Sequence, residues 1–319
     1  MKKLFAIVLA ALLVVSMTAC GGAKKDDGKY TIGICQYAPH PALDEATKGF
    51  IAAVEEGLGK ENVTWKSENA AGEATNCTSI VSSFVSAKVD LIMANATPAL
   101  VAAANATETI PVLGTSVTEY GVALEIKNFS GTVGTNVSGT SDLADLQKQA
   151  QMIVDWCPDA KNIGLLYCNA EPNSKYQVDE IQKLLEGKGL TCKQFAFADT
   201  NELANVTTSA AAWADAIYVP TDNTVANNAV AIDEICRPAG VPIIAGEAGI
   251  CSGCGIATLS ISYYDLGYAT GKMAVKILKG EAKISEMPIE YAPNVYPKYN
   301  EEICNALKIT PLAGYEKLS

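Results

Sequence analysis

Polar side chains stand directly after a short apolar run in the second half of the chain. Residues 216–219 (Ala-Ile-Tyr-Val) have the composition of a buried strand, and Pro220, Thr221, Asp222 and Asn223 follow at once. A hydroxyl, a carboxylate and an amide in succession can bind the polar ends of a small molecule. Ligands of open α/β sheets bind just beyond such strand ends. The segment therefore predicts a site for a small polar ligand.

Other apolar runs end in the same way, in hydroxyls, amides or a carboxylate. These runs, with the polar residues that follow them, occupy residues 91–97, 111–118, 163–169 and 241–247. Because the carboxyl ends of parallel strands meet at one edge of a sheet, we expect them to converge on one ligand.

A structural role for some of these residues stays open. Thr97, Thr221 and Asp222 each stand where a helix is expected to begin, and Thr and Asp are common helix caps. Ser141 and Asp142 are likewise expected to cap the helix that follows them. Capping and ligand binding are therefore alternatives for Thr97, Thr221 and Asp222.

Catalysis finds no support in the sequence. His40 is the single histidine, it stands between Pro39 and Pro41, and no nucleophile or metal partner is evident for it. We interpret it as a loop or pocket-rim residue. GxSxG, HExxH and P-loop patterns are absent from the sequence. We expect a protein that is not an enzyme, with no catalytic residues, no cofactor and no metal.

The composition restricts the partners and the chemistry of the cysteines. Lys and Arg total 24 against 35 Asp and Glu, so nucleic acid is not an expected partner, because its binding depends on neutralising phosphates. Of the ten cysteines, most lie in apolar runs and are expected to be buried and reduced. Cys251 and Cys254 form a CxxC in a Gly-rich segment without a second pair for zinc, and a local disulfide or free thiols both stay open.

Strand-like runs alternate with helix-period segments from Tyr30 onward. In the first half we expect strands over 30–36, 63–69, 89–94, 111–115 and 132–138 and helices over 41–58, 75–86 and 98–107. In the second half we expect strands over 162–167, 191–196, 216–219, 242–245, 256–260 and 290–296 and helices over 143–156, 174–188, 201–213, 225–237 and 264–279. This order predicts an α/β fold of two Rossmann-like lobes, each built on a parallel sheet.

The late helix over 264–279 indicates that the chain returns to the first lobe. Several crossings then form a multi-strand hinge, with a ligand cleft between the lobes. Tyr263 and Tyr264 are expected to pack at this hinge. The expected boundaries are 30–137 plus 262–291 for lobe 1 and 138–261 plus 292–319 for lobe 2.

Residues 1–20 are typical of a lipoprotein signal peptide. Two lysines precede an apolar run over 4–15 that is too short to span a bilayer, and small residues lead to Cys20. This resembles the bacterial lipobox, in which the Cys receives the lipid; a plain cleaved signal is the alternative. Residues 21–29 contain no core-forming residue and are expected to be a solvated tether. We expect a protein on the extracytoplasmic face of the bacterial cell membrane, held by the lipid anchor alone.

Motifs spread over the whole mature chain carry a family resemblance. They are 34–36 (Ile-Cys-Gln), 40–44 (His-Pro-Ala-Leu-Asp), 96–99 (Ala-Thr-Pro-Ala), 115–118 (Thr-Ser-Val-Thr), 136–139 (Asn-Val-Ser-Gly), 218–224 (Tyr-Val-Pro-Thr-Asp-Asn-Thr) and 263–267 (Tyr-Tyr-Asp-Leu-Gly). With the lipobox, they resemble the substrate-binding lipoproteins of ABC transporters in the tryptophan/tyrosine-type family. The resemblance implies a type I periplasmic-binding-protein fold, an ABC permease as partner, and an aromatic amino acid as the favoured ligand.

An amino acid bound in such a cleft needs contacts for both of its charged groups. Donors for its carboxylate are expected from Thr97, Ser116 and Thr118, aided by the helix N-terminus that follows Thr97. Its ammonium needs an anion, because only an anion offsets the loss of hydration, and Asp222 and Glu247 are the candidates.

Further contacts complete the expected site. The remaining polar candidates are Gln36, Asn173, Ser174, Thr221 and Asn223. Loop aromatics for the ligand's side chain are Tyr37, Tyr120 and Tyr176. Two departures from the family pattern, Cys35 where Thr is more frequent and 118–120 (Thr-Glu-Tyr) where Thr-Asp-Pro is common, leave the exact ligand open.

Two other functions stay open. A ligand-sensing lipoprotein for a membrane signalling partner would use the same fold, and a sugar or nucleoside receptor would use the same cleft. A sugar site usually has more Asp, Asn and Arg around a stacked Trp, and Arg237 is the single arginine of the chain. We expect a monomer.

Overall fold

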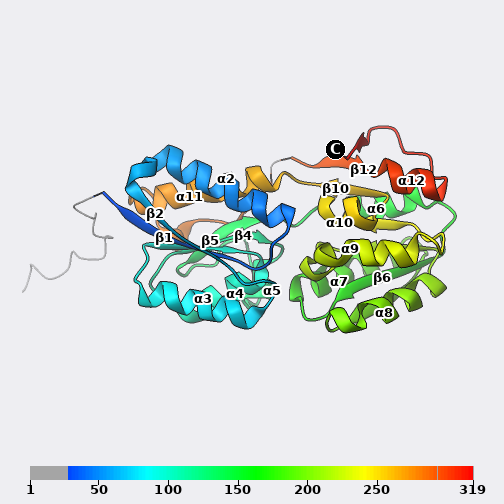
Figure 1. The fold of residues 1–319 in the computed structure, drawn as a ribbon, viewed down its shortest axis with the longest axis horizontal. Helices are drawn as coiled ribbons and strands as arrows, with labels where there is room; N and C mark the ends of the chain where they lie inside the picture. Colours follow the sequence, from blue (N-terminus) through cyan, green and yellow to red (C-terminus); the bar gives the residue numbers. More distant parts are fainter. Residues whose placement is uncertain (1–27, 293, 319) are drawn as a thin grey trace, which may run out of the picture.

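The computed structural model describes residues 28–292 and 294–318 and contains two lobes side by side (Figure 1). The expected signal peptide, the lipidation site Cys20 and most of the expected tether lie outside the described residues. Each lobe is a sheet of mostly parallel strands with helices on both faces, which confirms the predicted α/β class.

The first lobe is built on a parallel sheet of strand order β11-β5-β4-β3-β1-β2. Its strands are β1 (Tyr30–Gln36), β2 (Val63–Asn69), β3 (Leu91–Asn95), β4 (Val112–Val117), β5 (Val137–Ser141) and β11 (Glu290–Tyr291). Helices α2 (Pro41–Leu58) and α11 (Tyr263–Leu278) cover one face, and α3 (Ala74–Ser86), α4 (Thr97–Ala106) and the short α5 (Tyr120–Ala123) cover the other.

The second lobe repeats this plan with strand order β13-β12-β10-β9-β8-β6-β7. Its strands are β6 (Asn162–Cys168), β7 (Thr191–Phe197), β8 (Ala216–Val219), β9 (Ile243–Ala245), β10 (Ala257–Ser260), β12 (Tyr296–Tyr299) and β13 (Glu316–Lys317). Helices α8 (Thr200–Trp213), α9 (Asn223–Cys236) and α10 (Ala248–Cys254) pack on one face, and α6 (Leu146–Trp156), α7 (Pro172–Glu186) and α12 (Glu301–Leu307) pack on the other.

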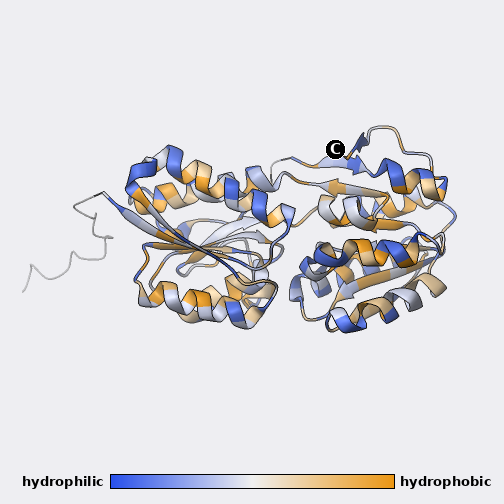
Figure 2. Ribbon diagram, viewed as in Figure 1, coloured by the Kyte–Doolittle hydropathy of each residue, from blue (hydrophilic) through white to orange (hydrophobic). Residues whose placement is uncertain are grey.

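The central strands are buried along their whole length because both of their faces are covered by helices. Every residue of β3, β4, β8 and β9 is buried. Figure 2 shows hydrophobic residues on the strands and on the helix faces turned toward them, with hydrophilic residues outside. Because both sheets end near the junction of the lobes, the polar residues after their strands are brought toward each other.

The chain passes between the sheets after β5, after β10 and after β11, which forms the hinge. β5 pairs with β4, so the first crossing follows Ser141 rather than residue 137. The strand expected over 290–296 is instead two strands in different sheets: β11 pairs with β5, and β12 pairs antiparallel with β10. The strand expected over 132–138 begins at Val137, because its partner in β4 starts at Val112.

The returning helix α11 is held against α2 by glycines. A Cβ at Gly267 would lie 1.9 Å from the carbonyl oxygen of Ala46, and one at Gly49 would lie 2.0 Å from that of Tyr264. Only glycine fits at such backbone contacts. This packing fixes the start of α11, and with it Tyr263, at the hinge.

The sequence did not predict α5, α10 or α12, each of seven residues or fewer. Cys251 and Cys254 lie on α10 and are buried. All nine cysteines in the described part of the chain are free thiols, as expected for most of them. Burial raises the pKa of the Cys251 and Cys254 thiols well above the ordinary value, so neither is an activated nucleophile.

Candidate functional site

A small cavity lies between the lobes, at the carboxyl ends of the central strands. Its lining residues come from both lobes and from the hinge: His40, Leu43, Ser116, Thr118, Asp142, Asn173, Thr221, Asp222, Asn223, Ala226, Glu247 and Tyr263. The remaining space is about 10 Å³. This is the volume that about one water molecule needs, so an amino acid can enter only if the lobes separate.

The first lobe contributes the hydroxyl of Ser116, whose backbone is strained. Ser116 has a φ of +53°, a left-handed conformation that is uncommon for a residue other than glycine, and the register between β4 and β5 shifts between Gly114 and Val117. The Oγ of Ser116 is buried and has no hydrogen-bond partner among the described residues. Such strain is typical of functional sites. The backbone thus holds a free hydroxyl against the cavity.

On the second lobe, Asp222 is a buried helix cap. Its Oδ1 accepts the N–H of Val225 in the first turn of α9 (2.9 Å), and its Oδ2 accepts the N–H of Cys168 at the end of β6 (2.8 Å). Burial, with the nearby charge of Glu171, raises the pKa of Asp222 well above its ordinary value. Both oxygens therefore already hold the strand end and the helix together.

Glu247 is also a cap. Its carboxylate oxygens accept the N–H groups of Gly249 (2.6 Å) and Ile250 (2.5 Å) at the start of α10. The side chain is 4% exposed and lines the cavity. As with Asp222, the contacts that the Glu247 carboxylate makes are those of a helix cap and not those of a free ligand-binding group.

Glu171 was not among the expected residues, yet it organises this side of the cleft. Its carboxylate accepts the backbone N–H groups of Asn223 (3.1 Å) and Thr224 (2.8 Å), and it also accepts from the Asn223 amide (2.7 Å). The amide nitrogen of Asn173 donates to Glu171 (3.2 Å) and to the carbonyl of Thr221 (3.2 Å). The Oδ1 of Asn173 has no partner among the described residues.

The hinge contributes Asp142 and Tyr263. The Tyr263 hydroxyl donates to Oδ2 of Asp142 (3.1 Å), and Oδ1 of Asp142 has no partner among the described residues. Burial raises the pKa of Asp142 to about 6, and the nearby hydroxyls of Thr118 and Tyr263 oppose this rise. The sequence predicted a helix cap here, but α6 is capped by Asp145, and the crossing after β5 places Asp142 in the cleft.

The expected site residues fall into two groups. Seven line the cavity: Ser116, Thr118, Asn173, Thr221, Asp222, Asn223 and Glu247. His40 lies there too, which agrees with its interpretation as a pocket residue. Its Nε2 is 3.3 Å from Oδ1 of Asn223 on the other lobe.

Four expected residues do not line this cavity. Gln36 donates to Asp44 (2.7 Å), and Ser174 is buried beneath Thr221, whose carbonyl it approaches at 3.5 Å. Thr97 starts α4 and lines a separate interlobe cavity of about 550 Å³. Tyr37 belongs to the core of the first lobe.

The loop aromatics differ from the expectation. Tyr120 is fully buried and donates to the carbonyl of Thr140 (3.0 Å), so it is a core residue and not part of the cleft wall. Tyr176 is partly buried on α7. Burial raises the pKa of its hydroxyl, and the charge of Glu119 from the first lobe adds to this rise. Tyr176 therefore stays near the junction of the lobes.

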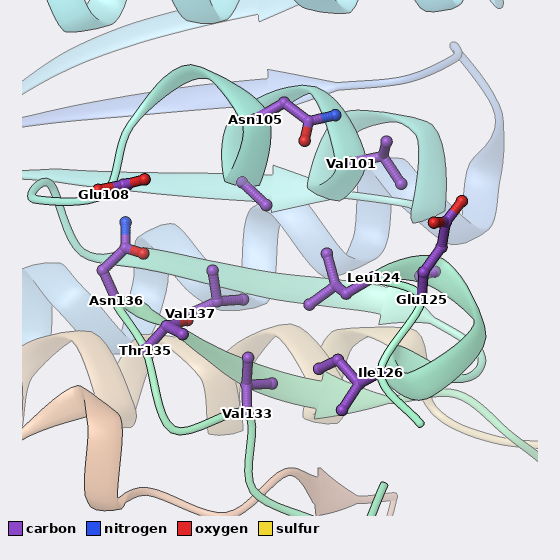
Figure 3. Close-up of a pocket in the computed structure, with 12 residues that line it drawn as sticks. Val101, Asn105, Glu108, Leu124, Glu125, Ile126, Val133, Thr135, Asn136 and Val137 are labelled. Atoms are coloured by element: carbon purple, nitrogen blue, oxygen red, sulfur yellow. The ribbon is translucent and has the colours of Figure 1, made fainter. Parts of the chain in front are cut away.

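A larger cavity of about 830 Å³ lies on the first lobe, away from the cleft. Figure 3 shows Val101 and Leu124 on its walls and the carboxylates of Glu108 and Glu125 at its edge. The amide of Asn136 is engaged by the carbonyls of residues 107 and 110. With no unpaired buried polar atom among its lining residues, this cavity lacks the features of a specific site.

No group of His, Cys, Asp and Glu in the described chain is arranged to hold a metal ion. The residues that line the cleft offer hydrogen-bonding groups, and three of them have an unpaired polar atom among the described residues. Such an arrangement can bind a polar solute when the lobes close on it.

Comparisons with known proteins agree with this geometry. The model of a family described as ABC transporter substrate binding protein matches residues 31–312. A tyrosine-binding protein of Clostridioides difficile (strain R20291) is 34% identical over 327 aligned residues, which cover 98% of this chain and 94% of that protein.

Two solved structures are similar over most of the chain. An ABC domain from Streptococcus pneumoniae in complex with L-Trp is 33% identical with a TM-score of 0.85, over 90% of this chain and 99% of that one. A ligand-free, open substrate-binding protein with adhesive properties from Clostridium difficile is 36% identical with a TM-score of 0.71, over 91% and 99% of the two chains. The higher TM-score with the tryptophan complex accords with the narrow cleft.

Proposed function

The chain belongs to the family of ABC transporter substrate-binding proteins, and from this premise we propose that it captures an aromatic amino acid in the interlobe cleft and delivers it to an ABC permease. Members of the family are extracytoplasmic solute receptors. The family and the homologue are named for binding rather than for catalysis, and this supports a role as a binding protein.

One observation carries the proposal: three residues that line the same cavity each have a buried polar atom without a partner in the described part of the chain. These atoms are Oγ of Ser116 from the first lobe, Oδ1 of Asn173 from the second lobe and Oδ1 of Asp142 from the hinge. A buried polar atom that makes no hydrogen bond costs about 1–3 kcal/mol. A ligand with a carboxylate and an ammonium would satisfy a hydroxyl and a carboxylate at once.

Closure of the lobes gives capture a physical basis. Contacts to Ser116 and Asn173 come from opposite lobes, so a ligand makes both only when the cleft is closed. Binding then shifts the population toward the closed form by the difference in affinity between the two states. A permease that recognises the closed lobes would distinguish loaded receptors from empty ones.

Ring burial alone does not give useful affinity. An aromatic side chain that buries about 150–250 Å² contributes roughly 4–6 kcal/mol before the costs of association. Micromolar binding requires about 8 kcal/mol net. The polar groups of the cleft must therefore contribute. We assign ligand contacts to five of the expected residues that line the cavity, Ser116, Thr118, Asn173, Thr221 and Asn223, joined by His40, Asp142 and Tyr263. Asp222 and Glu247 line the same cavity, but their oxygens hold the starts of α9 and α10.

We further propose that the receptor is a monomer held at the membrane by a lipid on Cys20. No helix in the described residues is long and apolar enough to cross a membrane. Replacing the lipidated Cys with Ser should release the protein from the membrane fraction into the medium. Retention of the Ser variant in membranes would contradict the anchor.

A sugar ligand is less well supported. Arg237, the single arginine, pairs with Asp233 (2.6 Å) and Glu302 (2.8 Å) on the second lobe, away from the cleft lining. A signalling role would use the same capture step, and uptake of radiolabelled ligand in cells with and without the receptor separates it from transport.

The test of the ligand class is a thermal-shift screen of the purified protein against the twenty amino acids, common sugars and nucleosides, with calorimetry on each hit. A ligand that binds the folded form raises its melting temperature. A shift with Trp, Tyr or Phe supports the proposal. No shift with any amino acid, together with a shift for a sugar or nucleoside, would overturn it.

A further inference from the structure

Among the described residues that line the cavity, Asp142 is the one carboxylate with an oxygen that makes no hydrogen bond. Asp142 lines the cavity and is 5% exposed, and its Oδ1 has no hydrogen-bond partner among the described residues. None of the ion pairs in the described chain involves it. A buried carboxylate without a cation is destabilising by itself.

The other carboxylates near the cavity are engaged by the backbone. Both oxygens of Asp222 and both oxygens of Glu247 accept N–H groups at helix starts. Glu171 accepts from the backbone and side chains of Asn223 and Thr224. A ligand that took these oxygens would compete with the caps of α9 and α10.

The surroundings hold Asp142 in a fixed orientation. Tyr263 donates to Oδ2 from the first turn of α11, a helix fixed by its glycine contacts with α2. Ser141, the preceding residue, donates from its hydroxyl to the carbonyl of Thr118 (2.7 Å). The hydroxyl of Thr118 is also near this carboxylate, but it makes no hydrogen bond to Oδ1. Oδ1 is thus the oxygen that remains for a ligand donor.

We propose that Oδ1 of Asp142 accepts the α-ammonium group of the ligand, so that the hinge, and not the second lobe, selects for a cationic amine. This inference deepens the proposed function and rests on it. An ammonium would supply the missing charge and hydrogen bond together. Ser116, whose Oγ is also free, is then the donor for the ligand's carboxylate.

The experiment compares two probes on matched variants. L-Tyrosine carries the ammonium, and 3-(4-hydroxyphenyl)propionate is the same molecule without it. Calorimetry gives the ratio of their affinities for the wild type, Asp142→Asn and Glu247→Gln. If L-tyrosine does not bind, L-tryptophan with indole-3-propionate replaces the pair.

In the wild type, we expect the ammonium-bearing probe to bind about 10- to 100-fold more tightly than its analogue. Asp142→Asn should remove most of this preference, and Glu247→Gln should keep it. Loss of the preference in Glu247→Gln with retention in Asp142→Asn would overturn the assignment while leaving the proposed function intact. If no aromatic amino acid binds the wild type, both fail.

A measurement on the wild type covers the case in which Asp142→Asn does not fold. Protonating Asp142 removes its charge, so affinity for L-tyrosine should fall as the pH drops from 7.5 to 5, while affinity for the analogue should not fall. The titratable groups that face Asp142 are Tyr263 and Glu247 in the cleft and Tyr120 beneath it. His40 and Asp222 also line the cavity, and the analogue controls for any effect of pH that does not act through the ammonium. Equal pH profiles for both probes would refute the assignment.

Discussion

The Nε2 atom of His40 lies 3.3 Å from Oδ1 of Asn223, and this contact joins the two lobes across the cleft. The direction of the bond follows from its surroundings. The amide nitrogen of Asn223 donates to Glu171 (2.7 Å), so Oδ1 of Asn223 is an acceptor and Nε2 of His40 is the donor. The single histidine thereby contacts the first residue of α9.

Removing this contact should favour the open form. We expect His40→Ala to weaken ligand binding about two- to tenfold, because one hydrogen bond contributes about 0.5–1.5 kcal/mol net. The effect should lie mainly in a faster dissociation rate, measured by stopped-flow fluorescence. Lys48→Ala on α2, the helix that begins directly after His40, is the control, since Lys48 is exposed and pairs with its neighbour Glu45. An unchanged dissociation rate in His40→Ala would show that the contact does not hold the lobes together.

The ionised form of Asp142 should destabilise the ligand-free protein above pH 6. The ordinary Asp pKa is about 3.8, and burial raises that of Asp142 to about 6. The unfolded chain loses this proton at lower pH than the folded chain, so stability from this group is highest below pH 4 and is lost as the pH rises to about 6.

Asp142→Asn should therefore be more stable than the wild type at pH 7, by up to about 3 kcal/mol, and equal to it near pH 3.5. Urea unfolding at both pH values measures the difference. A variant that is less stable at pH 7 would indicate that the carboxylate has a structural role, as its expected capping role implied.

The sequence predicted the fold well where elements are long and periodic. The bounds of β1, α2 and β2 agree with the predicted ranges, because apolar periodicity and the turns at Gly59 and Ala71 mark their ends. β5 was misplaced because its residues, Val-Ser-Gly-Thr-Ser, lack an apolar pattern, and only pairing with β4 makes them a strand.

The site was harder to predict than the fold. Polar residues at strand ends are visible in the sequence, but it does not reveal which of their atoms already have backbone partners. Asp222 and Asp142 both precede helices and resemble caps, yet the backbone occupies both oxygens of Asp222 and leaves Oδ1 of Asp142 free. Asp142 and Tyr263 are more than a hundred positions apart in the chain, and only the hinge crossings bring them together. The sequence pattern around either residue does not reveal this contact.

Truncating Asp222 should mainly reduce stability. Asp222→Ala leaves the buried N–H groups of Cys168 and Val225 without partners, which should cost about 2–4 kcal/mol in unfolding free energy. Asp199→Ala, which removes the exposed cap of α8, should cost less, about 0.5–2 kcal/mol. The same melting curves recorded with ligand separate the roles: the ligand-induced shift should persist in Asp222→Ala. Its disappearance in a folded variant would restore Asp222 as a ligand contact.

The packing of α11 on α2 should be intolerant of a single methyl group. In Gly267→Ala the new Cβ would lie 1.9 Å from the carbonyl oxygen of Ala46, closer than any real contact, so the helices must separate. We expect a loss of about 1–3 kcal/mol or more in unfolding free energy. Gly187→Ala, where the nearest atom is 3.2 Å away, should change stability far less.

The same substitution should also lower ligand affinity. Because Tyr263 begins α11, separation of the helices moves the hydroxyl that donates to Asp142. Ligand affinity should therefore fall in the folded fraction of Gly267→Ala and not in Gly187→Ala. Equal stability and affinity of the two variants would mean that α11 is not fixed by its glycine contacts and that the hinge geometry has another origin.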